Sequence, residues 1–186
     1  MSKNITLNRI NEMNREGFVT RFGSLFEHSP WVVEEAWKSR PFSSVEEMWR
    51  TFEDVMYSAP RERQLDLIRA HPDLAGKAAV AGELTQESAR EQASAGLDRL
   101  SPGEFEEFTR VNREYREKFG LPMVVCVREH TKESILENVQ SRLGNSRDEE
   151  IRTALAEISK ISHYRLQGLI EREGKQRPKH VGEGRE

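Results

Sequence analysis

Apolar residues recur every three or four positions along most of the chain, which is the pattern of amphipathic helices. The first such stripe, in residues 15–30, consists of Phe18, Phe22, Leu25 and Phe26. The segments that carry stripes of this kind are 15–30, 30–42, 43–60, 60–72, 85–95, 101–120, 131–144 and 146–169. The pattern therefore predicts about eight helices, with residues 73–82 forming a loop or a short turn of helix between two of them.

Signals for helix ends agree with these segments. Three helices are expected to begin with a capping box, in which a serine and a glutamate three residues later bond each other's backbone amides. The pairs are Ser44 with Glu47, Ser101 with Glu104, and Ser146 with Glu149. Gly96 and Gly120 end two helices, because glycine accepts the left-handed conformation that commonly follows the last turn.

One stretch departs from the helical pattern. Residues 121–127, LPMVVCV, are rich in β-branched side chains, yet no second strand-like stretch is available to pair with them. We therefore expect an extended buried segment rather than a sheet. The predicted fold class is all-α, a single-domain helical bundle in residues 1–172 followed by a charged, disordered tail in residues 173–186.

Composition and charge narrow the class of protein. The chain has 186 residues, enough for one domain with its own core, and its 29 basic and 32 acidic residues give a net charge of −3. This balance argues against a nucleic-acid partner, because phosphate binding needs a local excess of Lys and Arg. The longest apolar run is too short to span a membrane, and residues 1–8 lack the apolar core of a signal peptide. With one cysteine, Cys126, and an ending Gly184-Arg185-Glu186 unlike a peroxisomal signal, a cytoplasmic location is predicted.

Several common catalytic motifs are missing from the sequence. The five histidines, at positions 28, 71, 130, 163 and 180, include no close pair, and there is no HExxH, paired-cysteine or EF-hand pattern. The chain also has no phosphate-binding glycine loop and no nucleophile elbow, and Cys126 fits a small buried hydrophobe. No metal and no cofactor are therefore predicted, which leaves acid–base chemistry by side chains.

His71 is the first candidate for such chemistry. It stands at the end of a predicted helix, before Pro72 and a run of small residues up to Ala79. The carbonyl end of a helix favours a protonated imidazole by about 0.3–2 kcal/mol, which predicts a substantial charged fraction near neutral pH. Such a group can anchor an anionic substrate or deliver a proton. The alternative is a histidine that only caps its own helix by bonding the last carbonyls.

A second segment carries polar side chains beside small ones. Four residues spaced three, four and seven positions apart share one helix face: Ser88, Glu91, Gln92 and Ala95. A hydroxyl, a carboxylate and an amide beside alanine suit a small hydrogen-bonding pocket. The alternative is an ordinary solvated helix face. We expect this segment and the one around His71 to face the same cavity.

Four longer motifs point to one enzyme family. They are HPDLAGKAA at 71–79, REQASAGLDRL at 90–100, FTRVNREYREKFGLPMVVCVREHTKESIL at 108–136 and SRLGNSRDEEIRTALAEISKISHYRL at 141–166. Together they resemble the 2-oxo-4-hydroxy-4-carboxy-5-ureidoimidazoline (OHCU) decarboxylases of urate catabolism, over residues 7–171. The resemblance implies an all-helical homodimer without metal or organic cofactor, which decarboxylates OHCU stereoselectively to (S)-allantoin. It also implies functional or fused association with other urate-pathway enzymes.

The resemblance further implies roles for individual residues. His71 matches the catalytic histidine, as proton donor or electrostatic partner, and Pro72 matches an adjoining contact. The ligand-binding helix is matched by Ser88, Ala89, Arg90, Glu91 and Gln92. Of these, Glu91 is expected to be a catalytic group closest to the chemistry, able to orient or recharge the imidazole. The pocket-lining extended segment, whose unpaired amides are expected to bond the ligand, is matched by Met123, Val124, Val125, Cys126 and Val127.

Two other functions remain open on the sequence alone. A helical protein-interaction module would use the small-residue groove, with Arg128, Glu129 and His130 at its interface. A family member acting on a related small anionic ureido compound would keep the same pocket.

Three tryptophans give more aromatic surface than one small core needs, which favours the homodimer: Trp31, Trp37 and Trp49.

Overall fold

The computed structural model of the chain describes residues 5–170. The α-helices in this range are α1 Leu7–Asn11, α2 Arg15–Phe22, α3 Trp31–Ala36, α4 Val45–Ser58, α5 Arg61–Arg69, α6 Lys77–Ala81, α7 Gln86–Ser94, α8 Pro102–Phe119, α9 Lys132–Arg142 and α10 Arg147–Leu169. Three 3₁₀ turns, Gly23–Leu25, Trp37–Ser39 and Val127–Glu129, accompany them. The same residues contain one isolated bridge, between Ile5 and Ile170, and no strand. The predicted all-α class is confirmed, with the five-residue helices α1 and α6 added to the eight expected.

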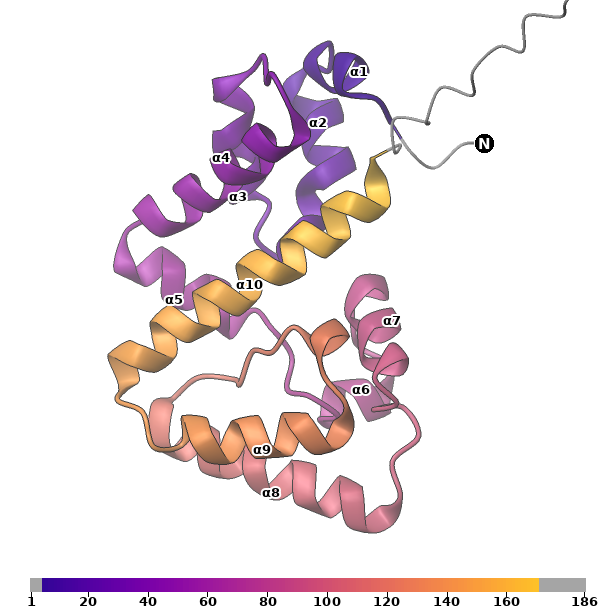
Figure 1. Ribbon diagram of the computed structural model, residues 1–186, viewed down its shortest axis with the longest axis vertical. Helices are drawn as coiled ribbons and strands as arrows, with labels where there is room; N and C mark the ends of the chain where they lie inside the picture. The colour runs from indigo at the N-terminus through magenta and orange to yellow at the C-terminus, as the bar shows by residue number, and fades with distance from the viewer. Residues whose placement is uncertain (1–4, 171–186) are drawn as a thin grey trace, which may run out of the picture.

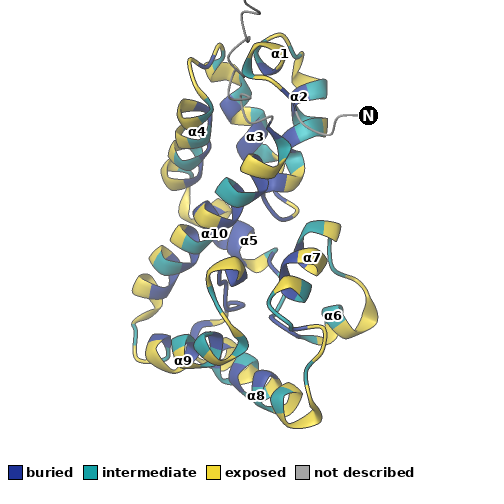
Figure 2. Cartoon of the chain, turned by 45° about the vertical axis from the view of Figure 1, so that its right-hand side comes forward, coloured by how far each residue is buried: buried dark blue, intermediate teal, exposed yellow. Residues whose placement is uncertain are grey.

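Helix α10 organises the molecule. It crosses the structure, with α1–α4 gathered at one end and α6–α9 at the other, while α5 lies near its middle (Figure 1). Its 23 residues span about 35 Å at 1.5 Å per residue, which is long enough to connect both ends of a small domain. Exposed residues of α4 and α8 lie on the outer sides of these helices, and buried residues on the inner sides (Figure 2).

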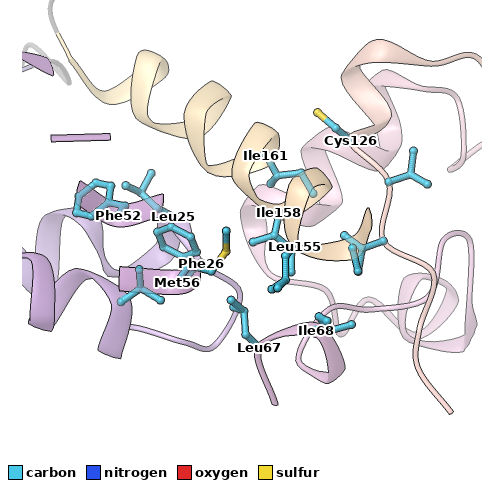
Figure 3. Packing of buried hydrophobic residues seen from close by; sticks show 14 of the residues in the cluster. Leu25, Phe26, Phe52, Met56, Leu67, Ile68, Cys126, Leu155, Ile158 and Ile161 are labelled. Carbon is cyan, nitrogen blue, oxygen red and sulfur yellow. The ribbon is translucent and has the colours of Figure 1, made fainter. Parts of the chain in front are cut away.

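An apolar core runs along α10. At one end the ring centroids of Phe18 and Phe22 are 4.9 Å apart, and those of Phe26 and Phe52 are 6.0 Å apart. Figure 3 shows Phe26 and Phe52 on one side of α10 and Cys126 of the extended segment on the other. Helix α10 therefore packs against both halves of the molecule, which explains why it carries so wide an apolar stripe.

The first predicted stripe is buried as expected, but it does not form a single helix. Helix α2 ends at Phe22, Leu25 lies in a 3₁₀ turn, and Phe26 is extended, with φ −117° and ψ 122°. Glycine and serine follow Phe22 and are weak helix formers, so the helix ends there. The turn that follows brings the side chain of Glu27 inside the protein, where it is 2% exposed.

Two of the three predicted capping boxes are confirmed, at Ser101 and Ser146. At Ser44 only half of the box forms. The Ser44 hydroxyl accepts a hydrogen bond from the Glu47 amide at 3.0 Å, whereas the Glu47 carboxylate accepts one from the amide of Ser43 at 2.6 Å. The start of α4 is nonetheless where the sequence places it.

The extended segment is buried as predicted and is held by side chains instead of a partner strand. Nη1 of Arg142 in α9 donates to the carbonyl oxygen of Val124 at 2.8 Å. The amide of Cys126 donates to Oε2 of Glu157 in α10, also at 2.8 Å. Buried backbone groups need hydrogen-bond partners, and here two neighbouring helices supply them.

The three tryptophans are accommodated within one chain. The guanidinium of Arg40 lies 4.2 Å from the ring centroid of Trp37, that of Arg63 lies 4.5 Å from Trp31, and the ring of His163 lies 4.4 Å from Trp49. All three indoles also pack against the apolar core. Intrachain contacts therefore account for part of this aromatic surface, all three side chains stay partly exposed, and the homodimer stays a prediction.

Two further expectations concern membranes and the tail. No helix within residues 5–170 is long and apolar enough to cross a membrane. The tail predicted for residues 173–186 lies outside the described residues.

Candidate active site

One pocket collects candidate residues from distant parts of the chain. It lies where the end of α5, helix α7, the extended segment and α10 meet. Its lining residues are His71, Pro72, Leu74, Ser88, Glu91, Gln92, Val124, Val125, Val127, Ile161 and Arg165. The two segments expected to face one cavity therefore do so. The pocket is small, with a cavity volume of about 30 Å³.

His71 combines the two roles considered for it. Its Nδ1 lies 2.9 Å from the carbonyl oxygen of Leu67, one turn back in α5. Because a carbonyl oxygen only accepts, Nδ1 of the neutral ring carries the proton and Nε2 keeps its lone pair. Nε2 is buried and has no hydrogen-bond partner within residues 5–170. The helix cap thus fixes the tautomer and leaves Nε2 available at the pocket.

The expectation of a protonated His71 near neutral pH is wrong. Burial lowers the pKa of His71 to about 4, although the bond to the Leu67 carbonyl and the charge of Glu27 act to raise it. The residue is 6% exposed, and the loss of hydration of a charged imidazole outweighs a helix-end effect of at most about 2 kcal/mol. His71 is therefore neutral at pH 7, and its Nε2 is a proton acceptor.

This low pKa predicts a specific loss of stability in acid. The unfolded chain binds a proton at His71 below about pH 6.5, whereas the folded protein does so only near pH 4. Neutral His71 therefore contributes about 3 kcal/mol to the free energy of unfolding. This contribution is fully present above pH 6.5 and is lost as the pH falls toward 4. Urea unfolding at about pH 7 and pH 4.5 measures it. Between these two pH values, we expect the free energy of unfolding to fall by about 2–3 kcal/mol more in the parent protein than in His71→Asn. Equal losses in the two proteins would contradict the prediction.

The densest polar contacts in the pocket belong to Arg165 of α10. Its Nε and Nη2 each donate to one carboxylate oxygen of Glu91, both at 2.9 Å. Nη2 also donates to Oγ of Ser88 at 3.3 Å, and Nη1 donates at 3.1 Å to both Glu27 and the carbonyl of Ser24. All five N–H bonds of the guanidinium thus have protein acceptors. Burial acts to lower the pKa of Arg165, but the hydrogen bonds and charges of Glu91 and Glu27 together raise it more, so the guanidinium stays charged.

Sequence comparisons identify the family. The family model described as OHCU decarboxylase matches residues 11–167. The chain belongs to the OHCU decarboxylase family. It is 44% identical over 162 residues to the 2-oxo-4-hydroxy-4-carboxy-5-ureidoimidazoline decarboxylase of Haloferax volcanii, covering 87% of this chain and 94% of that protein. The decarboxylase of the same name from Xenopus laevis is 40% identical over 164 residues, covering 88% and 94%.

A longer relative matches most of this chain, and two solved structures share its fold. The uric acid degradation bifunctional protein PucL of Bacillus subtilis is 37% identical over 169 residues, which make up 91% of this chain but 33% of PucL. Crystal structures of an (S)-allantoin synthase and of an OHCU decarboxylase in the presence of (S)-allantoin share the fold. Their TM-scores are 0.72 and 0.62 at 23% and 20% identity. The matches cover 90% and 84% of this chain, and 54% and 97% of the other chains.

Two buried charged residues of this OHCU decarboxylase family member escaped the sequence analysis. Arg165 lies four positions after Ile161 and seven after Ile158, so it continues the buried stripe of α10. An arginine within this apolar stripe is a signal in the sequence, because charged residues are rarely buried without a partner of opposite charge. Glu27 directly follows Phe26, the last apolar residue of the first stripe, and no periodic signal points to it.

Four of the predicted ligand-binding residues do not line the pocket. Ala89 and Arg90 are exposed on α7, because one face of that helix reaches the pocket and these two residues lie on another. Met123 and Cys126 belong to the buried apolar core, while three valines of the extended segment form the pocket wall. The remaining predicted residues, including Pro72, are brought together as expected.

Several contacts expected for the ligand are made within the protein. The amide of Cys126 donates to Glu157, so it is not available to a ligand in this arrangement. Both oxygens of Glu91 accept from Arg165, and no hydrogen bond within residues 5–170 joins Glu91 to His71. The amide oxygen of Gln92 accepts from the Ala75 amide at 2.9 Å and so supports the loop after His71. The polar side chains of α7 therefore shape the pocket as well as line it.

Proposed function

We propose that this chain catalyses the stereoselective decarboxylation of OHCU to (S)-allantoin in urate breakdown, without a metal or an organic cofactor. Family membership supports the substrate, which the relatives from H. volcanii and X. laevis carry in their names. One structural observation supports the chemistry: the unprotonated Nε2 of His71 lies at a pocket whose other charged groups are held by one another. Within residues 5–170, no three His, Cys, Asp or Glu side chains gather to hold a metal ion.

The substrate itself defines what the pocket must do. Its carboxylate and hydroxyl share one ring carbon, and the ureido group sits on the neighbouring carbon, which is part of a C=N bond. When CO₂ leaves, the electron pair of the broken C–C bond forms a C=C bond, and the nitrogen of the C=N bond takes a proton from water. The hydroxyl then gives up its proton and becomes a carbonyl, while the ureido-bearing carbon gains one. Addition of that proton to one face yields (S)-allantoin.

In this proposal His71 moves the proton. Its Nε2 accepts the hydroxyl proton and returns one to the adjacent carbon, since one imidazole can serve both atoms from the same side of the ring. Glu91, held by Arg165, and Gln92 lie in the pocket wall on α7, where an ureido group finds both acceptors and donors. The rigid frame supplies orientation, which is a large part of catalysis for a substrate this reactive.

Circular dichroism tests the proposed reaction. Urate is oxidised by urate oxidase and hydroxyisourate hydrolase with and without this protein, and the optical activity of the allantoin is followed. We expect the signal of (S)-allantoin with the protein and a racemic product without it, because the substrate also decays without enzyme. An interaction module, or an enzyme for another ureido compound, would leave the optical activity unchanged, and that result would exclude the proposed reaction.

The variant Glu91→Gln is expected to lose about 10- to 100-fold in turnover. An amide keeps one acceptor, but its NH₂ group then faces an N–H of Arg165, so the paired arrangement at 2.9 Å is broken. Initial rates of the circular-dichroism signal measure turnover, and calorimetry with (S)-allantoin measures binding. Glu91→Asp, which keeps the charge, serves as the comparison. Parental turnover in Glu91→Gln would show that no carboxylate is needed at this position.

We further propose that the enzyme is a cytoplasmic homodimer that associates with other urate-pathway enzymes, functionally or by fusion. PucL and the uric acid degradation bifunctional protein of Bacillus sp. strain TB-90 support the association, because this chain covers 33% and 32% of them. Light scattering at micromolar concentration tests the dimer. A monomer mass would exclude it.

A further inference from the structure

Glu27 is a buried carboxylate that is not among the residues lining the pocket. It lies in the turn between α2 and α3 and is 2% exposed. Its Oε1 accepts from the hydroxyl of Thr85 at 2.7 Å. Its Oε2 accepts from the hydroxyl of Ser88 at 3.0 Å and from Nη1 of Arg165 at 3.1 Å. Donors from the start of α7 and from α10 thus converge on one carboxylate.

We propose that Glu27 is a positioning residue of the decarboxylation, which holds the guanidinium of Arg165 and the hydroxyl of Ser88 in the pocket wall. This inference rests on the proposed function. Without the carboxylate, Nη1 of Arg165 would keep the Ser24 carbonyl as its acceptor, and the turn would lose its bonds to α7. Because Arg165 binds both oxygens of Glu91, a displaced guanidinium changes the pocket although Glu27 is not one of its lining residues.

The charge of Glu27 contributes as well as its shape. Burial acts to raise the pKa of Glu27, but its hydrogen bonds and the charge of Arg165 lower it more, so the carboxylate stays ionised. The charged or titratable groups that act on His71 are Glu27 and His28 from the turn and Arg165 from α10, with Glu91 of α7 in the same pocket. Among the first three, Glu27 favours the imidazolium formed during proton transfer, whereas His28 and Arg165 oppose it.

Glu27→Gln tests the inference, because an amide cannot replace both carboxylate oxygens. If its oxygen accepts from Thr85, its NH₂ faces the donors of Ser88 and Arg165. We expect kcat for (S)-allantoin formation to fall about 10- to 100-fold while KM changes less than about threefold, as for a displaced positioning group. Glu27→Asp keeps the charge on a shorter side chain, and its kcat is expected to lie between the two.

NMR of the Arg165 side chain gives a second measurement, one that does not depend on activity. A guanidinium held by acceptors on every side rotates slowly about its Nε–Cζ bond, so its Nη protons give separate signals. In Glu27→Gln one acceptor is lost, and we expect those signals to broaden or merge. The disappearance of the signals in Arg165→Lys assigns them.

Glu53→Gln is the matched control. Glu53 in α4 also accepts a hydrogen bond from a serine of α10, Ser159, at 2.5 Å, but it does not line the pocket. We expect parental kcat and parental Arg165 signals in this variant.

Each outcome decides between the inference and a purely structural role. A folded Glu27→Gln with parental kcat and parental Arg165 signals would overturn the inference, even if its melting temperature is lower. If Glu27→Gln does not fold, the same two measurements on Glu27→Asp decide, and parental values there would equally overturn it. Failure of the proposed function would appear elsewhere, as racemic allantoin formed by the parent protein itself.

Discussion

The variant His71→Asn is expected to keep its fold while its rate of (S)-allantoin formation falls about 10²–10⁴-fold, the usual contribution of a positioned acid–base group. An asparagine amide nitrogen lies close to the position of Nδ1, so the bond to the Leu67 carbonyl can persist. Pro72 still ends the helix, since proline disfavours helical conformation in the residue before it. The variant loses Nε2 of His71, which has no hydrogen-bond partner among residues 5–170. Initial circular-dichroism rates and the melting temperature measure both effects.

His130→Asn is the control for this variant. The Nδ1 atom of His130 also has a near neighbour four positions away, the hydroxyl of Ser134 at 3.1 Å, but His130 does not line the pocket. We expect its rate to equal that of the parent. Full stereoselective activity in His71→Asn would mean that His71 is a helix cap and no more.

Arg165→Met is expected to lower the free energy of unfolding by about 3–5 kcal/mol, as when one partner of a buried ion pair is removed. Methionine fills a similar volume but leaves the carboxylates of Glu27 and Glu91 buried without their shared cation. The side chain of Arg165 is 5% exposed, so water does not replace the lost bonds easily. Urea unfolding at pH 7 measures the loss, and decarboxylation should fall with it because Glu91 is no longer held.

Arg110→Met is the matched control for this loss. Arg110 also bonds two glutamates, Glu107 and Glu114, but on the surface of α8, where its side chain is 39% exposed. Exposed ion pairs contribute about 0–1 kcal/mol, so we expect a change within that range. A similar change in Arg165→Met would mean that the buried cluster adds little to stability.

Helix boundaries were predictable because their signals are local. The capping boxes at Ser101 and Ser146 involve atoms within four residues of each other, and both form. The apolar stripe of α10 was also predictable from the sequence, since its spacing follows from helix geometry alone. The break after Phe22 was not anticipated, because apolar spacing persists through Phe26 although the backbone leaves the helix.

The chain itself specified an all-helical fold, an extended segment with no strand to pair with, and the two segments that meet at the pocket. These follow from side-chain periodicity, from residue types and from motif order, all of which are properties of short stretches. Tertiary structure decided the ionisation of His71, because burial depends on what α10 and the extended segment place around the ring. It also decided the partners of Arg165, since Glu91 and Glu27 lie 74 and 138 positions before it and no local pattern links them. Hydration and charge pairing act through space, so they are determined only when distant segments come together.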